Sequence, residues 1–207
     1  MVEMTMEHGS HDFEATIHSV EAIDLKRMSL QDYIEFDRAT DERWEYVNGE
    51  AFIVKAASPA HNVVKGNVFV ALRAALKDRP CLAMPDGQKV STRRTRAYHY
   101  PDVLVVCDRP FYDPDDKDAI ENPTLIVEVL SPTTADYDRG GKFVHYRTLS
   151  SLSEYMIVST EPRLVERHRK LERGEWLMTE IHGGPIELLS IDVRLAWEDL
   201  WRDLDRL

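Results

Sequence analysis

The sequence is poor in cysteine and lacks long apolar runs. Cys81 and Cys107 are its two cysteines among 207 residues, and their spacing matches no metal-binding motif. We expect both to be reduced thiols that pack as small buried hydrophobes. No apolar run reaches membrane-spanning length, and residues 1–18 lack the basic and then apolar pattern of a secretory signal. The prediction is a cytoplasmic protein with no membrane partner.

The sequence is also short of positive charge. It has 26 Lys and Arg against 37 Asp and Glu, which gives a formal net charge of −11. That balance counts against a bulk, non-specific nucleic-acid binder, because phosphate attraction needs positive charge. It leaves open an enzyme with a local basic groove, and a dimer whose acidic residues lie on the far side.

Composition and length predict one globular unit. Hydrophobic residues make up 43% and charged residues 30%, as in ordinary soluble domains. Residues 1–25 show no clear periodicity, so we predict a flexible N-terminal tail. Residues 26–207 show no repeat or second domain and are expected to form a single domain.

The N-terminal part of this domain predicts a helix and a hairpin. Ser29 is a good N-cap for a helix that runs to about Ala39. Asn-Gly at positions 48–49 separates two strand-like runs, the strongest short-range hairpin signal. A two-residue turn there places Glu45 and Glu50 on one face of the hairpin. That face either lines a site or is solvent-exposed.

The remaining pattern alternates between helices and strands, so the fold class is α/β. We expect helices over about 58–77, 138–149 and 197–204, and strands over about 82–84, 88–92, 102–106, 124–130, 154–159, 163–170, 176–181 and 186–189.

Two carboxylates stand inside apolar strands. Asp102 begins one β-branched run, and Glu128 lies between Val127 and Val129 in the most hydrophobic segment of the chain. A carboxylate that leaves water uncompensated costs several kcal/mol, so such groups are usually paired or bind a metal. Two acids on neighbouring strands could hold one divalent cation.

The helix that follows carries a polar stripe. Asp138, Lys142 and Tyr146 are four residues apart and share one side of a helix. Gly140 and Gly141 weaken its first turn, by about 1 kcal/mol each relative to Ala. A closely approaching partner or ligand would explain these two glycines.

Several residues are candidates for contact with phosphate, although solvated loops or simple packing are the plainer explanation. They are His61, Arg93, Arg94, Arg96, Arg139 and Tyr146, followed by the strand residues Arg163, Arg167, Arg169 and Lys170, for which a solvated strand face is favoured.

Together these features resemble a known family. Pro101-Asp102 followed by Glu128-Val129-Leu130 is similar to the PD-(D/E)XK nuclease signature, and the wider pattern resembles the Uma2 family of restriction-endonuclease-like proteins. The shared features span about residues 29–200 and include Glu45 to Glu50, Ser58-Pro59 with His61, Ser131-Pro132, Asp138 with Lys142 and Tyr146, and Glu154-Tyr155.

The resemblance implies a restriction-endonuclease-like core: a mixed central β-sheet flanked by helices, with an N-terminal helix and β-hairpin and a C-terminal hairpin. It implies DNA cleavage that depends on Mg²⁺ or Mn²⁺. Asp102 and Glu128 would be metal ligands, the carbonyl of Val129 a third, and Glu45 or Glu50 an additional acid. The signature expects lysine where Leu130 stands, and Lys142 is the expected replacement.

Other readings remain open. A degenerate nuclease fold could serve as a binding or regulatory module, and a metal-dependent hydrolase of small phosphoesters would need no basic groove. Nucleases of this fold often act as homodimers. Apolar C-terminal residues could form such an interface or belong to the core; they are Trp176, Leu177, Trp197, Leu200 and Trp201.

Overall fold

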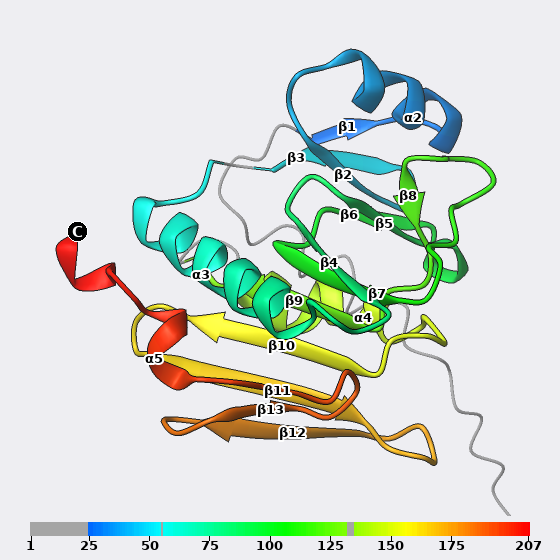
Figure 1. The fold of residues 1–207 in the computed structure, drawn as a ribbon. Helices are drawn as coiled ribbons and strands as arrows, with labels where there is room; N and C mark the ends of the chain where they lie inside the picture. The colour runs from blue at the N-terminus through cyan, green and yellow to red at the C-terminus, as the bar shows by residue number, and fades with distance from the viewer. Residues whose placement is uncertain (1–24, 55, 132–134) are drawn as a thin grey trace, which may run out of the picture.

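A computed structural model describes residues 25–54, 56–131 and 135–207 (Figure 1). The expected tail, residues 1–25, lies outside these ranges except for its last residue. No helix of the described chain is long and apolar enough to cross a membrane. The architecture is α/β, with two six-stranded sheets and one two-stranded sheet.

The main sheet is mixed and holds both acidic strands. β9 and β10 run parallel, and the other neighbouring pairs run antiparallel. β7 and β9 are adjacent at its centre and are buried on both faces, which explains their continuous apolar runs. The strand order is β12 (Trp176–Ile181), β11 (Leu164–Lys170), β10 (Glu154–Ser159), β9 (Leu125–Val129), β7 (Val103–Cys107) and β4 (Cys81–Pro85).

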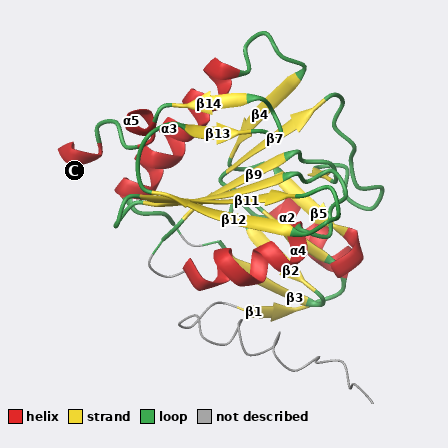
Figure 2. Ribbon diagram, turned by 90° about the horizontal axis from the view of Figure 1, so that it is seen from below, coloured by secondary structure: helices red, strands yellow, loops and turns green. Residues whose placement is uncertain are grey.

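Helices cover both faces of this sheet (Figure 2). On one face, α3 packs with the C-terminal elements around an aliphatic core that includes Val64, Val68 and Leu72. On the other face, a π-helical segment, η2, runs into a short helix, α4. The elements of the first face are α3 (Pro59–Ala75), β13 (Ile186–Leu188), β14 (Val193–Leu195) and α5 (Trp197–Leu200), and those of the second are η2 (Tyr137–Lys142) and α4 (Phe143–Tyr146).

The second sheet contains the predicted N-terminal hairpin. Its register is confirmed, with Val47 opposite Glu50 and Glu45 opposite Phe52. Asn48 and Gly49 both have positive φ, 45° and 102°, as a two-residue hairpin turn requires. The strand order is β1 (Leu25–Arg27), β3 (Glu50–Ile53), β2 (Trp44–Val47), β6 (Ala97–His99), β5 (Lys89–Thr92) and β8 (Ala119–Ile120).

Serine caps fix the starts of the two long helices, and the sequence predicted the first of these caps. The N-cap of α2 (Leu30–Ala39) is Ser29, whose hydroxyl accepts a hydrogen bond from the backbone of Asp32. Ser58 caps α3 in the same way, through the backbone of His61. This second cap sets the direction in which the first turn of α3 presents its side chains.

The C-terminal residues for which the sequence left a dimer interface or the core open belong largely to the core. Leu200 and Trp201 are buried, and the rings of Trp197 and Trp201 lie 4.1 Å apart. Trp176 packs edge-on against Phe143. Of these five residues, Leu177 is substantially exposed. The predicted helix over 197–204 is two short pieces, α5 and the 3-10 turn η3 (Leu204–Arg206).

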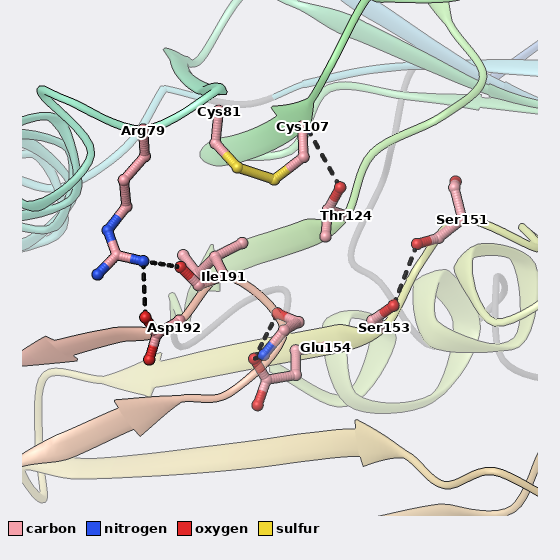
Figure 3. The surroundings of a disulfide bond; sticks show 10 residues. Arg79, Cys81, Cys107, Thr124, Ser151, Ser153, Glu154, Ile191 and Asp192 are labelled. Carbon is pink, nitrogen blue, oxygen red and sulfur yellow. Dashed lines mark hydrogen bonds and ion pairs between the residues drawn. A yellow bond between two sulfur atoms is a disulfide. The ribbon is translucent and has the colours of Figure 1, made fainter.

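The cysteines differ from the sequence expectation. Cys81 and Cys107 lie opposite each other on β4 and β7 and form a disulfide (Figure 3). The two cysteines are 26 residues apart in the sequence. The expectation of two reduced thiols was wrong because the pairing and register of the two strands that carry them could not be read from the sequence. The bridge joins the edge strand β4 to the strand that Asp102 precedes.

Candidate active site

A cleft of about 680 Å³ lies between the first turn of α3, the end of β3 and the first residues of η2. Asp102, Glu128, Val129 and Lys142 all line it, so the structure gathers the predicted central residues in one place. The short 3-10 turn η1 (Arg93–Thr95) belongs to a different part of the surface, and its residues do not line the cleft.

The two predicted metal-binding acids hold each other in place. The backbone amide of Asp102 donates to Oε2 of Glu128 at 3.3 Å. The amide of Val129 donates back to Oδ2 of Asp102 at 2.8 Å. Each carboxylate is therefore bonded to the backbone of the other strand, and the pairing of β7 with β9 brings the two side chains together.

Lys142 reaches the same point from η2. Its ammonium lies 3.3 Å from Oε1 of Glu128, 3.3 Å from Oε1 of Glu45 and 3.2 Å from Oδ1 of Asp138. Burial disfavours its charged form, but the three carboxylates outweigh burial and raise the pKa of Lys142 well above its usual value. The amine therefore stays protonated at neutral pH.

Glu128 is buried, with 2% of its surface exposed. Burial, and then repulsion from Asp138, Asp102 and Glu45, outweighs the attraction of Lys142 and raises its pKa well above the usual value. Tyr146, a candidate for DNA contact, is fully buried, and its hydroxyl donates to Oε1 of Glu128 at 3.1 Å. Tyr146 therefore orients Glu128 and does not face a substrate.

Glu45 contacts the Lys142 ammonium and two groups of β6 and the residue that follows it. Its Oε1 accepts from the backbone of Tyr100 at 2.9 Å, and its Oε2 lies 3.1 Å from Nδ1 of His99. Burial opposes its ionisation, yet Lys142 and His99 together lower the pKa of Glu45 to about 2. Glu50, the alternative additional acid, is paired with Arg27 at 3.1 Å and does not line the cleft.

His61 lies against Asp102. The first turn of α3 places its Nε2 at 3.1 Å from Oδ2 of Asp102, and the imidazole is buried. The same oxygen accepts from the amide of Val129, so one oxygen of Asp102 has two partners. His61 therefore fixes the orientation of Asp102. The sequence had offered His61 as a candidate for phosphate contact, and in the structure its Nε2 contacts this carboxylate.

The predicted arginines do not line the cleft. Arg93 lies 3.8 Å from Asp115 and 3.6 Å from Glu121, and Arg139 pairs with Glu166 at 2.8 Å. Arg94 belongs to the same turn as Arg93, and Arg96 is the C-cap of that turn. Besides Lys142 and His61, the basic residues that line the cleft are Arg43 and Lys65, which sequence reasoning missed.

Arg43 and Lys65 share one acidic partner. Both contact Oδ2 of Asp86, at 2.8 and 3.1 Å. Each stands alone in its own stretch of sequence, so neither gave the clustered signal of residues 93–96.

Tyr137 was also missed, and it explains one of the two glycines. A Cβ added to Gly141 would lie 2.3 Å from Cδ2 of Tyr137, so the ring packs directly on that glycine. A Cβ on Gly140 would meet nothing within 4 Å. The close approach expected at this turn therefore comes from Tyr137, which lines the cleft beside Asp138.

The donor set of the cleft suits a divalent cation. Asp102 and Glu128 are carboxylates, as hard cations prefer, and burial, followed by repulsion from neighbouring carboxylates, raises the pKa of Glu128. Among residues 25–54, 56–131 and 135–207, no three His, Cys, Asp or Glu side chains form a complete metal cage. A site with two carboxylates and bound water is the arrangement typical of Mg²⁺.

Comparisons with known proteins identify the family of this chain. Residues 30–200 match the Uma2 family, whose description is "Putative restriction endonuclease". The chain belongs to the Uma2 family. Two proteins of Synechocystis sp., named uncharacterized proteins sll1609 and slr1290, are each 30% identical to it. The first match covers 79% of this chain and 92% of the relative, and the second covers 86% and 93%.

A solved structure of another protein has a fold similar to that of this Uma2 chain. The crystal structure of a "putative nuclease belonging to DUF820" from Anabaena variabilis has a TM-score of 0.65 and 15% sequence identity. The match covers 80% of this chain and 93% of that one. The mixed sheet flanked by helices is therefore the restriction-endonuclease-like fold that the sequence predicted, and the family and fold together support a nuclease.

Proposed function

We propose that the protein is a divalent-metal-dependent endonuclease that hydrolyses DNA phosphodiester bonds. The observation that carries this proposal is the reciprocal bonding of Asp102 and Glu128, with the Lys142 ammonium 3.3 Å from Glu128. A chain that needed these residues only for folding would gain little from three buried acids around one amine, because buried ion pairs seldom stabilise a fold.

Asp102 and Glu128 would hold Mg²⁺ or Mn²⁺, with the carbonyl of Val129 as a candidate third ligand. A divalent cation so held supplies an acidified water and offsets negative charge on the phosphate. His61 and Tyr146 keep the two carboxylates in place through their contacts with Asp102 and Glu128. Such outer partners commonly change metal affinity by about 10–100-fold when they are lost.

Lys142 acts as a positive charge in this proposal. Because its three carboxylate neighbours raise its pKa, it does not serve as the base that takes a proton from water. Its ammonium instead offsets the charge of Glu45, Glu128 and Asp138.

The substrate would enter along the wall that carries Arg43 and Lys65. Arg43 has several N–H groups besides the one bonded to Asp86. Seven carboxyl side chains also line the cleft, so a polyanion gains access only when cations are bound; they are Asp41, Glu42, Glu45, Asp86, Asp102, Glu128 and Asp138.

Cleavage of supercoiled plasmid DNA tests the proposal. We expect nicking with Mg²⁺ or Mn²⁺, none with EDTA, and none from Asp102→Asn, with folding checked by circular dichroism. DNA binding without cleavage by the wild type would instead favour a degenerate binding module. Turnover of a chromogenic phosphodiester without DNA affinity would favour a hydrolase of small phosphoesters.

A further inference from the structure

The hydroxyl of Tyr137 is buried at the edge of the cleft without a partner. Tyr137 is 8% exposed, and its hydroxyl oxygen has no hydrogen-bond partner within the part of the chain that the structure describes. Buried polar groups are nearly always bonded, because an unpaired one destabilises the fold. A phenylalanine would fill this space without that cost, so the hydroxyl needs another explanation.

The ring is held in a fixed position. It packs directly on Gly141, where a Cβ would come within 2.3 Å. The rings of Phe52 and His99 meet it edge-on, with centroids 5.8 and 6.2 Å away. These contacts come from η2, β3 and β6, so three elements of the fold determine where the hydroxyl lies.

The acidic side chains nearby are engaged by other donors. Oε1 of Glu45 accepts a hydrogen bond from the backbone of Tyr100 and pairs with the Lys142 ammonium, and Oε2 contacts Nδ1 of His99. Both oxygens of Glu128 have partners too, in Lys142, Tyr146 and the amide of Asp102.

An incoming ligand could therefore supply the acceptor for Tyr137. A phosphodiester brings two non-bridging oxygens, each a strong acceptor, to the cleft that Tyr137 and Lys142 both line.

We propose that Tyr137 is a substrate-contacting residue whose hydroxyl donates a hydrogen bond to a non-bridging oxygen of the bound phosphodiester. This inference rests on the proposed nuclease function and adds a side chain that binds the strand itself. Tyr137 forms no covalent bond in this scheme. It positions the phosphate and stabilises its negative charge, as hydrogen-bond donors do in other phosphoryl-transfer sites.

Tyr137→Phe removes the hydroxyl alone and tests the proposal. Tyr33→Phe is a matched control, because the Tyr33 hydroxyl donates to the carbonyl of Trp44 at 2.7 Å, is buried, and lies outside the cleft. Three quantities are measured for each variant: the thermal midpoint, the affinity for a labelled single-stranded oligonucleotide in Ca²⁺, and the cleavage rate in Mg²⁺.

We expect Tyr137→Phe to weaken binding or slow cleavage about tenfold, the size of one hydrogen bond to a charged group, with a thermal midpoint equal to or above the wild type. Tyr33→Phe should lower the midpoint by about 2–4 °C and leave binding and cleavage unchanged. Replacing the non-bridging oxygen of the substrate with sulfur should slow cleavage by the wild type more than it slows cleavage by Tyr137→Phe.

The opposite results would overturn the inference. Tyr137→Phe that binds and cleaves like the wild type shows that the hydroxyl contacts no substrate. A fall in midpoint as large as that of the control shows a structural role. If the wild type binds the strand but does not cleave it, the proposed function fails while the binding comparison still decides on Tyr137. If the wild type neither binds nor cleaves, both proposals fail.

Discussion

Replacing Lys142 with methionine should expose how much negative charge the cleft holds. Lys142→Met keeps the length of the side chain but removes the one ammonium that lies between Glu45, Glu128 and Asp138. Breaking a buried ion pair by removing one partner costs about 3–5 kcal/mol, because the remaining charge is left buried and unpaired. For a domain of this size, 1 kcal/mol corresponds to about 2–4 °C, so the midpoint should fall by about 6–20 °C at pH 7.

The pH dependence of that loss gives a second check. The raised pKa of Lys142 means that its contribution is fully present below the unfolded value of about 10.4 and is lost only as the pH rises through the folded value. Lys142 therefore stays charged between pH 5 and 8. In the variant, the orphaned carboxylates can take up protons as the pH falls, so the gap to the wild type should narrow toward pH 5.

Differential scanning calorimetry of both proteins across pH 5–8 makes the measurement. Lys65→Met is the matched control, because Lys65 pairs with Asp86 alone, at the more exposed cleft wall, and such a pair contributes about 1 kcal/mol or less. If Lys142→Met unfolds at the wild-type temperature, or loses no more stability than the control, the buried charge cluster described above does not exist in solution.

Three further variants test other parts of the site. Burial raises the pKa of Glu128 above its unfolded value, so the native state binds extra protons between the two pKa values and the stability of the wild type falls as the pH rises. Glu128→Gln should lack this pH dependence of stability, be more stable than the wild type at pH 8, and cleave no DNA. Chemical unfolding that shows the same pH dependence in both proteins would refute this. His61→Ala should weaken Mn²⁺ binding about tenfold in a calorimetric titration, since it frees Asp102, and equal affinity would show that His61 has no such role. Gly141→Ala should lower the thermal midpoint and the cleavage rate while Gly140→Ala lowers neither, and equal effects would contradict the close packing at Gly141.

The hairpin and the acidic strands could be predicted because their signals are local. Asn48-Gly49 determines both the turn and the register, so the opposition of Glu45 and Phe52 follows from the turn alone. Asp102 and Glu128 are conspicuous as charges in apolar runs, and sequential strands are often neighbours. The pairing of β7, which Asp102 directly precedes, with β9, which holds Glu128, brings the site together.

Pairings between strands that are far apart in the sequence could not be predicted from such local signals. The predicted strands over 82–84 and 88–92 lie next to each other in sequence but belong to different sheets. β5 instead pairs with β6 and, in parallel, with β8, which has only two residues and no usable pattern. The bond between Cys81 and Cys107 depends on a register of the same kind.

The cleft residues that were missed lacked any distinctive sequence pattern. The arginines of residues 93–96 were noticed because they are clustered, while the cleft wall uses Arg43 and Lys65 from distant elements. Tyr137 could have been suspected from Gly141 four residues later, since a glycine in a helix can mark a close approach. No rule of sequence says which ring fills that space.

Calorimetric titration of Mn²⁺ into the wild type and Asp102→Asn tests the central claim most directly. The account predicts saturable binding to the wild type that is lost, or at least about tenfold weaker, in the variant, with both proteins folded by circular dichroism. Equal binding by the two proteins, or no binding by the wild type, would contradict the claim that Asp102 and Glu128 form a metal site.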